Sequence, residues 1–354
     1  GRHILGHKDK IATLFSKVRS SLPSKASDTL DFMPESYVLR GSLQADTKLS
    51  AVLKKSGDDT VWIRKPCCSS MGRGIRVFKA GDASTELNDV DEKDSSTWCV
   101  VQKYVSNPYL VKGKKADMRV YVLVASFDPL VVYLYQDGIV KFCTSNFDLS
   151  SERLKIREVH LANQAINKFS PDFVLNQDID SGSRWTHVGY WSEMERTHGK
   201  DRVVVAKRKL EKLVAKTFAT AVPHVMSEMK RLECESSNLT CFEMFGLDVE
   251  MDDNLNPHLL EVNVAPEIMV RRGDSMSMQV VGALASDMFR VVGVRSKPSS
   301  DSLPVVSDDI ALSKACRDVL KDCSEKEQHQ LLELQNQLER SHTTMFKRVF
   351  PCHD

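Results

Sequence analysis

The sequence predicts an α+β protein with largely antiparallel sheets, built as several packed lobes. Clusters of predicted strands alternate with predicted helices, and no stretch of the sequence is repeated. The 354 residues are 42% hydrophobic and 27% charged, which is a globular composition with enough chain for two or three lobes. The formal net charge of +1 gives no global field that would point to nucleic acid. An acidic partner would therefore have to meet local basic patches.

The nine Cys residues include no C-x-x-C pair, and the ten His residues show no metal-ligand spacing. This pattern favours reduced thiols over a disulfide framework or a zinc site. No apolar run approaches the roughly 18 residues of a membrane span, and no secretory signal is visible. We therefore expect a cytoplasmic protein without a membrane partner. Because the chain begins at Gly1 and not at Met, we also expect it to be a piece of a longer protein.

The first half of the chain predicts one helix followed by five strands. The helical pattern lies around Lys10–Ser20. Asp137 and Gly138 form a two-residue hairpin signal inside the fifth strand, so we expect the chain to reverse there. The strands are runs rich in β-branched and aromatic residues, and they span Thr60–Pro66, Gly74–Ala80, Thr97–Val105, Ala116–Phe127 and Leu130–Cys143.

The second half predicts a long helix over Asp201–Glu233, with apolar residues at helical spacing. Two strands follow, Phe242–Met251 and Pro257–Val264, joined by the turn DDNLN. Residues 296–309 are rich in Ser, Asp and Pro, which is typical of a linker. A further helical pattern lies near Glu325–Ser341.

The two strands around the DDNLN turn carry oxygen-bearing side chains within apolar runs. If these strands pair, we expect Asp248 to face Asn263 and Glu250 to face Glu261 on one side of the sheet. Three acids and an amide cannot share a dry face unless a cation neutralises them. Hard oxygen ligands of this kind suit Mg²⁺. The alternative is an ordinary solvated polar face.

The segment Ser69–Ile75 (SSMGRGI) joins two predicted strands and has the features of a phosphate-binding loop. Its glycines, Gly72 and Gly74, permit close approach of the backbone to a phosphate. Lys65 before the loop and Arg73 within it supply positive charge. By itself a plain hairpin loop would explain this segment equally well. It is not a P-loop, which requires G-K-[ST] at the start of a helix.

Five segments occur in a characteristic order along the chain: WIRKP…SSMGRGI, VVQKYVSNPYLVKGKKADMRVYVLV, DPLVVYLYQDGIVKF, HLANQAIN and CFEMFGLDVEMDDNLNPHLLEVN. Together they resemble the tubulin tyrosine ligase-like family, from about Gly6 to Val294. The resemblance implies an ATP-grasp-type fold, in which antiparallel sheets enclose a nucleotide. The C-terminal QLERSHTTMFKRVFP resembles an extension found in the polyglutamylase branch of the family.

On this basis we expect five regions along the chain. They are an N-terminal lobe at 1–55 with its upstream part missing, a central nucleotide-binding lobe at 56–125, a C-terminal ATP-grasp lobe with the metal site at 126–295, a polar linker and short helix at 296–324, and a C-terminal helical extension at 325–354.

The resemblance also implies roles for single residues. Lys65 and Lys115 would hold phosphates, residues 69–75 would form a lid, residues 102–105 would surround adenine, and Asp117 would lie near the sugar. Arg119 would face the reacting centre, although a salt bridge to a neighbouring carboxylate is the alternative. Mg²⁺ would bind Asp248, Glu261 and Asn263. The residues expected to contact ATP are Lys65, Gly72, Arg73, Gly74, Ile75, Gln102, Lys103, Tyr104, Val105, Lys115, Asp117, Ala162 and Asn163.

The implied reaction joins free glutamate to a glutamate side chain of an acidic tubulin tail or a related acidic protein. ATP would phosphorylate the acceptor carboxylate, and the amine of the incoming amino acid would then displace phosphate. Basic stretches at Lys112–Lys115, Lys207–Lys216 and Arg271–Arg272 suit acidic tails on microtubules. The expected location is the cytoplasm and cytoskeleton, with the cilium or basal body as a narrower location.

Several positions depart from the family pattern near the amino-acid site. Lys141 stands where the family has an Arg expected to grip the carboxylate of the incoming amino acid, and Lys lacks the bidentate fork of Arg. Ala162, Gln164 and Glu267 also differ. Glutamate is the expected amino acid, and glycine remains open. The other hypotheses are a microtubule-binding module with a decayed site and an ATP-grasp kinase of a small molecule.

Overall fold

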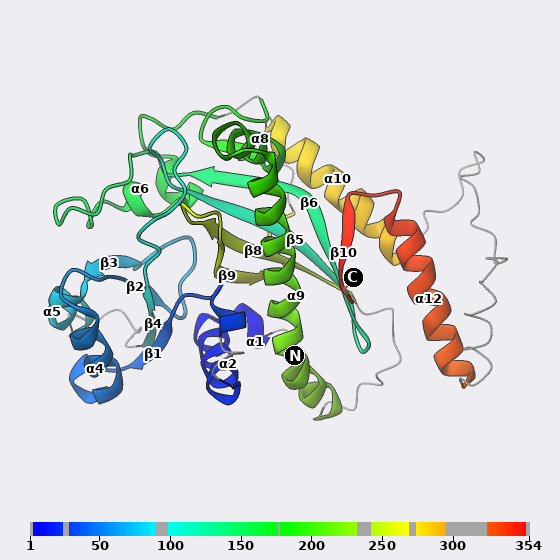
Figure 1. Ribbon diagram of the computed structural model, residues 1–354, viewed down its shortest axis with the longest axis horizontal. Helices are drawn as coiled ribbons and strands as arrows, with labels where there is room; N and C mark the ends of the chain where they lie inside the picture. Colours follow the sequence, from blue (N-terminus) through cyan, green and yellow to red (C-terminus); the bar gives the residue numbers. More distant parts are fainter. Residues whose placement is uncertain are drawn as a thin grey trace.

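The computed structural model describes residues 3–23, 28–88, 98–175, 178–231, 242–268, 274–294 and 324–351. Its strands form two sheets whose pairs are antiparallel, and helices pack against both sheets (Figure 1). The small sheet has the strand order β1-β4-β2-β3. The large sheet has the order β10-β6-β5-β8-β9, with β7 also paired to β6. The predicted α+β class with antiparallel sheets is therefore confirmed.

The small sheet consists of β1 (Ser36–Arg40), β2 (Val61–Pro66), β3 (Arg76–Lys79) and β4 (Trp98–Lys103). Helices α4 (Thr47–Ser56) and α5 (Ala83–Asn88) cover one face, where Trp62 belongs to a core with their leucines. Side chains alternate along a strand, so Ile63 and Lys65 point to the opposite face. That second face looks toward the large sheet.

The large sheet consists of six strands that give the chain its main core. Helices α8 (His187–His198) and α9 (Lys200–Arg231) cover one face, and α10 (Ser275–Val292) covers part of the other, beside α12 (Glu325–Ser341) (Figure 1). The strands are β5 (Ala116–Phe127), β6 (Leu130–Phe142), β7 (Arg184–Thr186), β8 (Glu243–Met251), β9 (Pro257–Val264) and β10 (Phe346–Phe350).

The strand β5 is apolar on both faces because helices cover both sides of the sheet. Val120 and Val122 lie in the core beneath α9, whereas Tyr121 and Leu123 lie in the core beneath α10. The second face becomes polar toward the start of β5. That polar half of the face, which looks toward the small sheet, carries the candidate site.

The remaining elements are short or lie at the N-terminus. Helix α1 (His3–Gly6) contacts β9 and α9 on the side of the large sheet, whereas α2 (Lys8–Ser21) contacts β1 and β4 of the small sheet and also α9. Helices α6 (Arg157–His160) and α7 (Gln164–Asn167) follow β6, and 3₁₀ turns span Asp28–Leu30, Leu43–Ala45 and Ala80–Asp82. Within the described ranges, no helix has the length and apolar character needed to cross a membrane.

The hairpin predicted at Asp137-Gly138 is wrong. The strand β6 continues through both residues, and the chain reverses instead at Asp128-Pro129 between β5 and β6. The Asp-Gly pair marks a break in the β5–β6 register, which shifts between the Val120 and Val122 pairs. Asp137 is fixed there because its Oδ1 accepts hydrogen bonds from the backbone N–H groups of Gly138 and His187, at 2.8 and 3.0 Å.

The strands are distributed differently from the predicted lobes. The strand β1, within the predicted 1–55 lobe, belongs to the small sheet. The predicted boundary at 125/126 falls inside β5 and separates most of that strand from its partner β6. The predicted extension at 325–354 is a helix only as far as Ser341. It then forms β10, which pairs with β6 and buries Phe346 against Tyr135. Most of the predicted 296–324 linker lies outside the described residues.

Candidate active site

A cavity opens between the polar half of the large sheet and the inner face of the small sheet. Most residues predicted to contact the nucleotide line it, although they come from distant parts of the chain. Lys141, Asp248 and Glu261, predicted as substrate or metal ligands, line it too. The predicted nucleotide residues along its wall are Lys65, Gly72, Arg73, Ile75, Gln102, Lys103, Tyr104, Val105, Lys115, Asp117 and Asn163.

Four predicted residues do not line the cavity. Gly74 lies against Pro66, outside the wall. Ala162 is buried at 1% exposure, so its side chain faces the protein interior. Arg119 and Asn263 contact Asp248 from behind the cavity wall. A direct contact of Gly74 or Ala162 with a nucleotide is therefore not supported by the geometry.

Lys65 reaches across the cavity from the small sheet to the large one. Its ammonium donates to Gln102 Oε1 at 2.7 Å and to the backbone carbonyl of Leu260 at 3.2 Å. That carbonyl is available because Leu260 is the extra residue of a β-bulge in β9. Burial lowers the pKa of Lys65 to about 8. A positive charge held this deep suits a bound anion.

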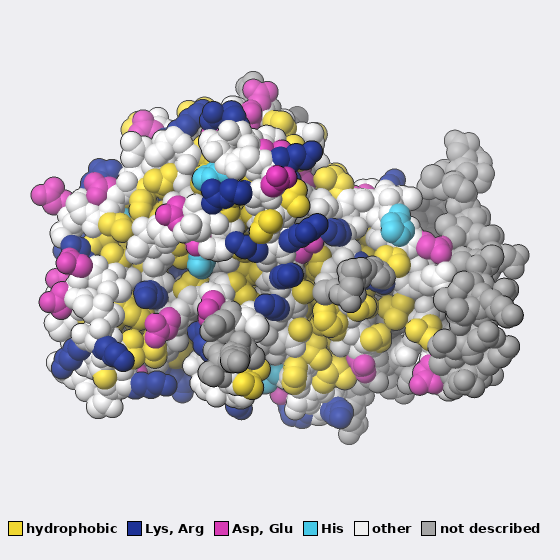
Figure 2. Space-filling view, viewed as in Figure 1, with side chains coloured by type: hydrophobic (Ala, Val, Ile, Leu, Met, Phe, Trp, Pro, Cys, Tyr) yellow, Lys and Arg dark blue, Asp and Glu magenta, His cyan; other side chains and the backbone are white. Residues whose placement is uncertain are grey.

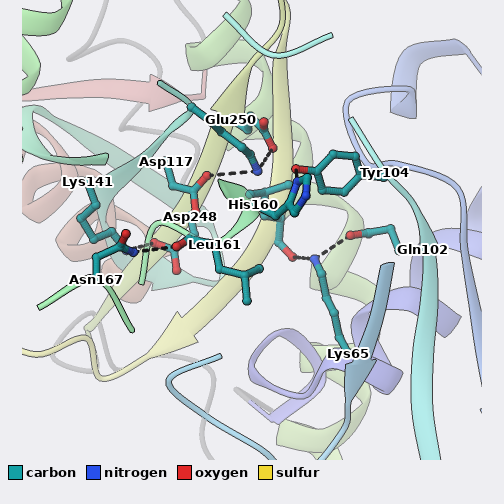
Figure 3. A network of polar contacts seen from close by, with 12 residues as sticks. Lys65, Gln102, Tyr104, Asp117, Lys141, His160, Leu161, Asn167, Asp248 and Glu250 are labelled. Carbon is teal, nitrogen blue, oxygen red and sulfur yellow. Dashed lines mark hydrogen bonds and ion pairs between the residues drawn. The ribbon is translucent and has the colours of Figure 1, made fainter. Parts of the chain in front are cut away.

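Lys115 directly precedes β5, and its ammonium lies between two carboxylates, those of Asp117 and Glu250, which are labelled in Figure 3. Its ammonium is 2.9 Å from Glu250 Oε2 and 3.8 Å from Asp117 Oδ1. It also lies 5.1 Å from the centre of the Tyr104 ring. Burial opposes its charge, but Glu250, Tyr104 and Asp117 together outweigh burial and raise the pKa of Lys115 above its ordinary value. Burial raises the pKa of Glu250 to about 7.

The metal hairpin forms with a register different from the predicted one. Asp248 pairs with Glu261, whereas the prediction placed it opposite Asn263; Glu250 pairs with His258. The difference at Asp248 is two residues, and a shift of two keeps every side chain on its face. Asp248, Glu261 and Asn263 therefore share one face as predicted, and Asn263 Nδ2 donates to Asp248 Oδ2 at 3.2 Å.

Positively charged side chains contact both carboxylates of this hairpin, those of Asp248 and Glu261. Arg119 Nε and Nη2 donate to Asp248 at 2.9 and 3.2 Å, and Lys141 Nζ donates to Asp248 at 3.4 Å. Burial alone would raise the pKa of Asp248, but Arg119 and Lys141 hold it well below its ordinary value. The salt-bridge alternative for Arg119 is thus realised. No group of three or more His, Cys, Asp or Glu side chains suited to a metal occurs in the described parts of the chain.

Two residues that sequence reasoning missed hold the glycine loop. Lys8, at the start of α2, donates to the carbonyl of Ser69 at 2.9 Å and lies 2.8 Å from Glu261 Oε1. Arg157 donates to the carbonyl of Gly72 at 2.7 Å. Gly72 has φ of 74°, and a Cβ there would lie 2.8 Å from Ile166 Cδ1. The loop is thus attached by hydrogen bonds to two segments that are far apart in sequence, α2 and α6.

Tyr104 and His160 form a second pair that the sequence did not predict (Figure 3). Tyr104 Oη lies 3.1 Å from His160 Nδ1, and His160 Nε2 lies 3.2 Å from the carbonyl of Arg153. Burial lowers the pKa of His160 to about 4, so the ring is neutral at pH 7. A neutral ring with both nitrogens engaged orients Tyr104 in the cavity wall. No local sequence signal connects residues 56 positions apart.

Comparison with known proteins defines the class of this fold and site. A family model described as "Tubulin-tyrosine ligase family" matches residues 3–301. This match covers most of the chain and includes the small sheet, the large sheet except β10, and all residues that line the cavity. The chain therefore belongs to the tubulin-tyrosine ligase family.

Individual relatives are glutamate-adding enzymes by name. The chain is 28% identical over 327 residues to tubulin monoglutamylase TTLL4 of Homo sapiens, covering 90% of this chain and 25% of the relative. It is 34% identical over 241 residues to tubulin polyglutamylase TTLL5 of Mus musculus, covering 67% of this chain and 17% of the relative. It is 29% identical over 297 residues to the probable tubulin polyglutamylase ttll-9 of Caenorhabditis elegans, covering 83% and 66%. The chain thus spans about a quarter or less of the first two relatives.

Proposed function

We propose that this chain is the catalytic region of an ATP-dependent ligase that adds glutamate to glutamate side chains of acidic tubulin tails. The observation that carries the proposal is the cavity between the sheets, where Lys65 and Lys115 converge with the Asp248–Glu261 face. A triphosphate requires buried positive charge and hard oxygen ligands for its metal ion, and this wall offers both. The names of the relatives support tubulin as the acceptor.

Mg²⁺ fits the chemistry of the donor set at the hairpin. Asp248 and Glu261 supply two carboxylates and Asn263 supplies an amide oxygen, all on one face. Water and phosphate oxygens would complete the shell, as is usual for this ion. When bound, the ion would neutralise phosphate charge. Lys8 pairs with Glu261 and Lys141 pairs with Asp248, and both lysines line the cavity. With Mg²⁺ bound to these carboxylates, the two lysines would become available to anionic substrates.

The proposed reaction has two steps. A carboxylate oxygen of the acceptor attacks the γ-phosphorus, the bond to the β-phosphate oxygen breaks, and ADP leaves from an acyl phosphate. The amine nitrogen of glutamate then attacks the carbonyl carbon, loses a proton, and phosphate leaves with the C–O electron pair. The protein would contribute position and charge: Lys65 and Lys115 would hold phosphates, and Arg119 would hold Asp248 in place.

The acceptor would be drawn by positive charge on the outside of the molecule. Lys and Arg side chains gather over the middle of one face, where α9 runs (Figure 2). Arg208 and Lys212 are exposed, whereas Lys207 pairs with Glu195. Lys115 is buried and does not belong to a surface patch, which corrects the predicted stretch at 112–115, and Arg271–Arg272 lies outside the described residues. Association with microtubules, and with the cilium more narrowly, follows from this proposal.

The altered amino-acid site supports a second candidate, a ligase for another amino acid such as glycine. Lys141 is engaged by Asp248 at 3.4 Å and offers a single point charge where an Arg fork would bind a carboxylate in two places. Glycine presents the same α-carboxylate with no side chain to recognise. Parallel reactions with labelled glutamate and glycine separate the two candidates.

The test is ATP-dependent incorporation of a labelled amino acid into tubulin, followed by mass spectrometry of the tails. We expect incorporation with the unmodified chain and loss of at least a hundredfold with Glu261→Gln, which removes a metal ligand. Glu228→Gln is the matched control, because Glu228 pairs with Arg231 at the far end of α9. Failure of every amino acid, with normal pelleting on microtubules, would favour a binding module instead. Phosphate transfer to a small molecule without tubulin would favour a kinase.

A further inference from the structure

Lys8, at the start of α2, connects the glycine loop to the metal hairpin. Its ammonium lies 2.8 Å from Glu261 Oε1 and donates to the backbone carbonyl of Ser69 at 2.9 Å. Helix α1 brings the chain to this place, because it packs so closely on β9 that a Cβ on Gly6 would lie 2.6 Å from Val264 Cγ2. One ammonium therefore joins two parts of the site that a bound metal–nucleotide complex would also join.

Positive charge exceeds negative charge at the empty hairpin. Arg119 and Lys141 both pair with Asp248, at 2.9 and 3.4 Å. Lys8 pairs with Glu261, which lies opposite Asp248 in the strand register. Three cations thus face two carboxylates, so a free divalent cation would approach a place that is already positive and would be repelled. The complex of the same cation with a triphosphate has a net negative charge and would be attracted.

Lys8 is the cation that neutralises Glu261. Among the described residues, it forms the only ion pair of this carboxylate. The two side chains are 15% and 32% exposed, so an incoming ion of higher charge can reach the pair and compete for the carboxylate. Lys65 does not take over this role, because Gln102 and the carbonyl of Leu260 hold its ammonium.

We propose that Lys8 is a positioning residue that keeps free divalent cations off Glu261, so that the metal enters this site only as a complex with the nucleotide. The inference rests on the proposed nucleotide-dependent function. When the complex arrives, its metal replaces the ammonium at Glu261, and the phosphates offer Lys8 a new partner. Because the same ammonium holds the carbonyl of Ser69, the glycine loop stays anchored to α2 until the complex binds.

The first test measures the binding of Mn²⁺ alone, without nucleotide, from the loss of the electron paramagnetic resonance signal of the free ion. Lys8→Met removes one positive charge and should bind Mn²⁺ about tenfold or more tightly than the unmodified chain. Lys8→Arg keeps the charge, so its affinity for Mn²⁺ should equal that of the unmodified chain. Lys10→Met is the matched control, because Lys10 is exposed on the same helix. In the Glu261→Gln background, Lys8→Met should give no gain.

The second test measures how fast trypsin cleaves after Arg73, which is exposed in the glycine loop. Without nucleotide, Lys8→Met should be cleaved there faster than the unmodified chain, because the carbonyl of Ser69 loses its anchor. Lys10→Met should be cleaved at the rate of the unmodified chain. An unchanged rate in Lys8→Met would overturn the link between Lys8 and the loop.

Equal affinity for Mn²⁺ in Lys8→Met and in the unmodified chain would overturn the inference, and so would a gain that persists in the Glu261→Gln background. If the unmodified chain binds Mn²⁺ together with a non-hydrolysable ATP analogue, but Lys8→Met binds Mn²⁺ alone no better, only this inference fails. If the unmodified chain does not bind that complex, the proposed function fails together with it.

Discussion

Lys65 should make the affinity for the nucleotide depend on pH between about 8 and 9. Burial lowers its pKa to about 8, from an ordinary value of 10.5. A triphosphate binds the protonated form, so apparent affinity follows the protonated fraction of Lys65. That fraction falls from about one half at pH 8 to about one eleventh at pH 9, which predicts roughly a fivefold loss of affinity. Binding at pH 8 should take up about half a proton.

Calorimetry of a non-hydrolysable ATP analogue, in buffers with different ionisation enthalpies, measures both the affinity and the proton uptake. Lys65→Arg is the matched control because guanidinium stays charged throughout this range, so its affinity should not change between pH 8 and 9. Glu250, with a pKa of about 7, is already largely ionised in that window and adds little. A flat affinity in the unmodified chain, or the same slope in Lys65→Arg, would refute the reasoning.

The lowered pKa of Lys65 also makes the stability of the fold depend on pH. Stability should rise with pH here, whereas it falls with rising pH for a lysine whose pKa is raised by an ion pair. The pKa of Lys65 is lower in the folded chain than in the unfolded chain, so the unfolded chain binds the proton more tightly. Below about pH 8 the charged side chain therefore costs about 3 kcal/mol of folding free energy. This cost disappears as the pH rises from about 8 to 10.5. Lys65→Met should be more stable than the unmodified chain at pH 7 in urea unfolding.

Three further predictions concern the loop, the hairpin and the C-terminal strand. Gly72→Ala should weaken ATP binding at least tenfold because its Cβ would lie 2.8 Å from Ile166 Cδ1. Gly41 also has a positive φ but has open space around it, so Gly41→Ala should lower the free energy of unfolding without weakening ATP binding. Equal losses of ATP affinity in the two variants would contradict this reasoning. Asp248→Asn should abolish ligation and lower stability by about 3 kcal/mol in urea unfolding, because buried cations lose their partner; retained turnover would exclude the hairpin as the site. Phe346→Ala should lower the free energy of unfolding in urea by about 3 kcal/mol because Phe346 is buried. Lys347→Ala should lower it by less than about 1 kcal/mol, since the ion pair of Lys347 is exposed. Similar losses in the two variants would mean that β10 is not held at the sheet edge by the core contact of Phe346.

The sequence predicted the strands, and which hairpin side chains share a face, better than it predicted the pairing of the strands. The limits of β5 were predicted without error, and the same-face prediction for Asp248, Glu261 and Asn263 survived a register error of two residues. The reason is parity: a strand has a period of two, so an even shift leaves every side chain on its face. The Asp137-Gly138 signal failed because contacts with α8, which lies far along the chain, keep that pair inside a strand.

The sequence by itself determined the local patterns: two groups of strands, a glycine loop with its lysine, and a hairpin with oxygen-bearing side chains. Those patterns depend on residues a few positions apart, so a linear reading can find them. Only the tertiary structure decided that Lys8 contacts Glu261, that Arg157 holds the glycine loop, and that Glu250 shares Lys115 with Asp117. These contacts join residues up to 253 positions apart. They arise because two covered sheets pack face to face, and the geometry of that packing has no signature in any short stretch of sequence.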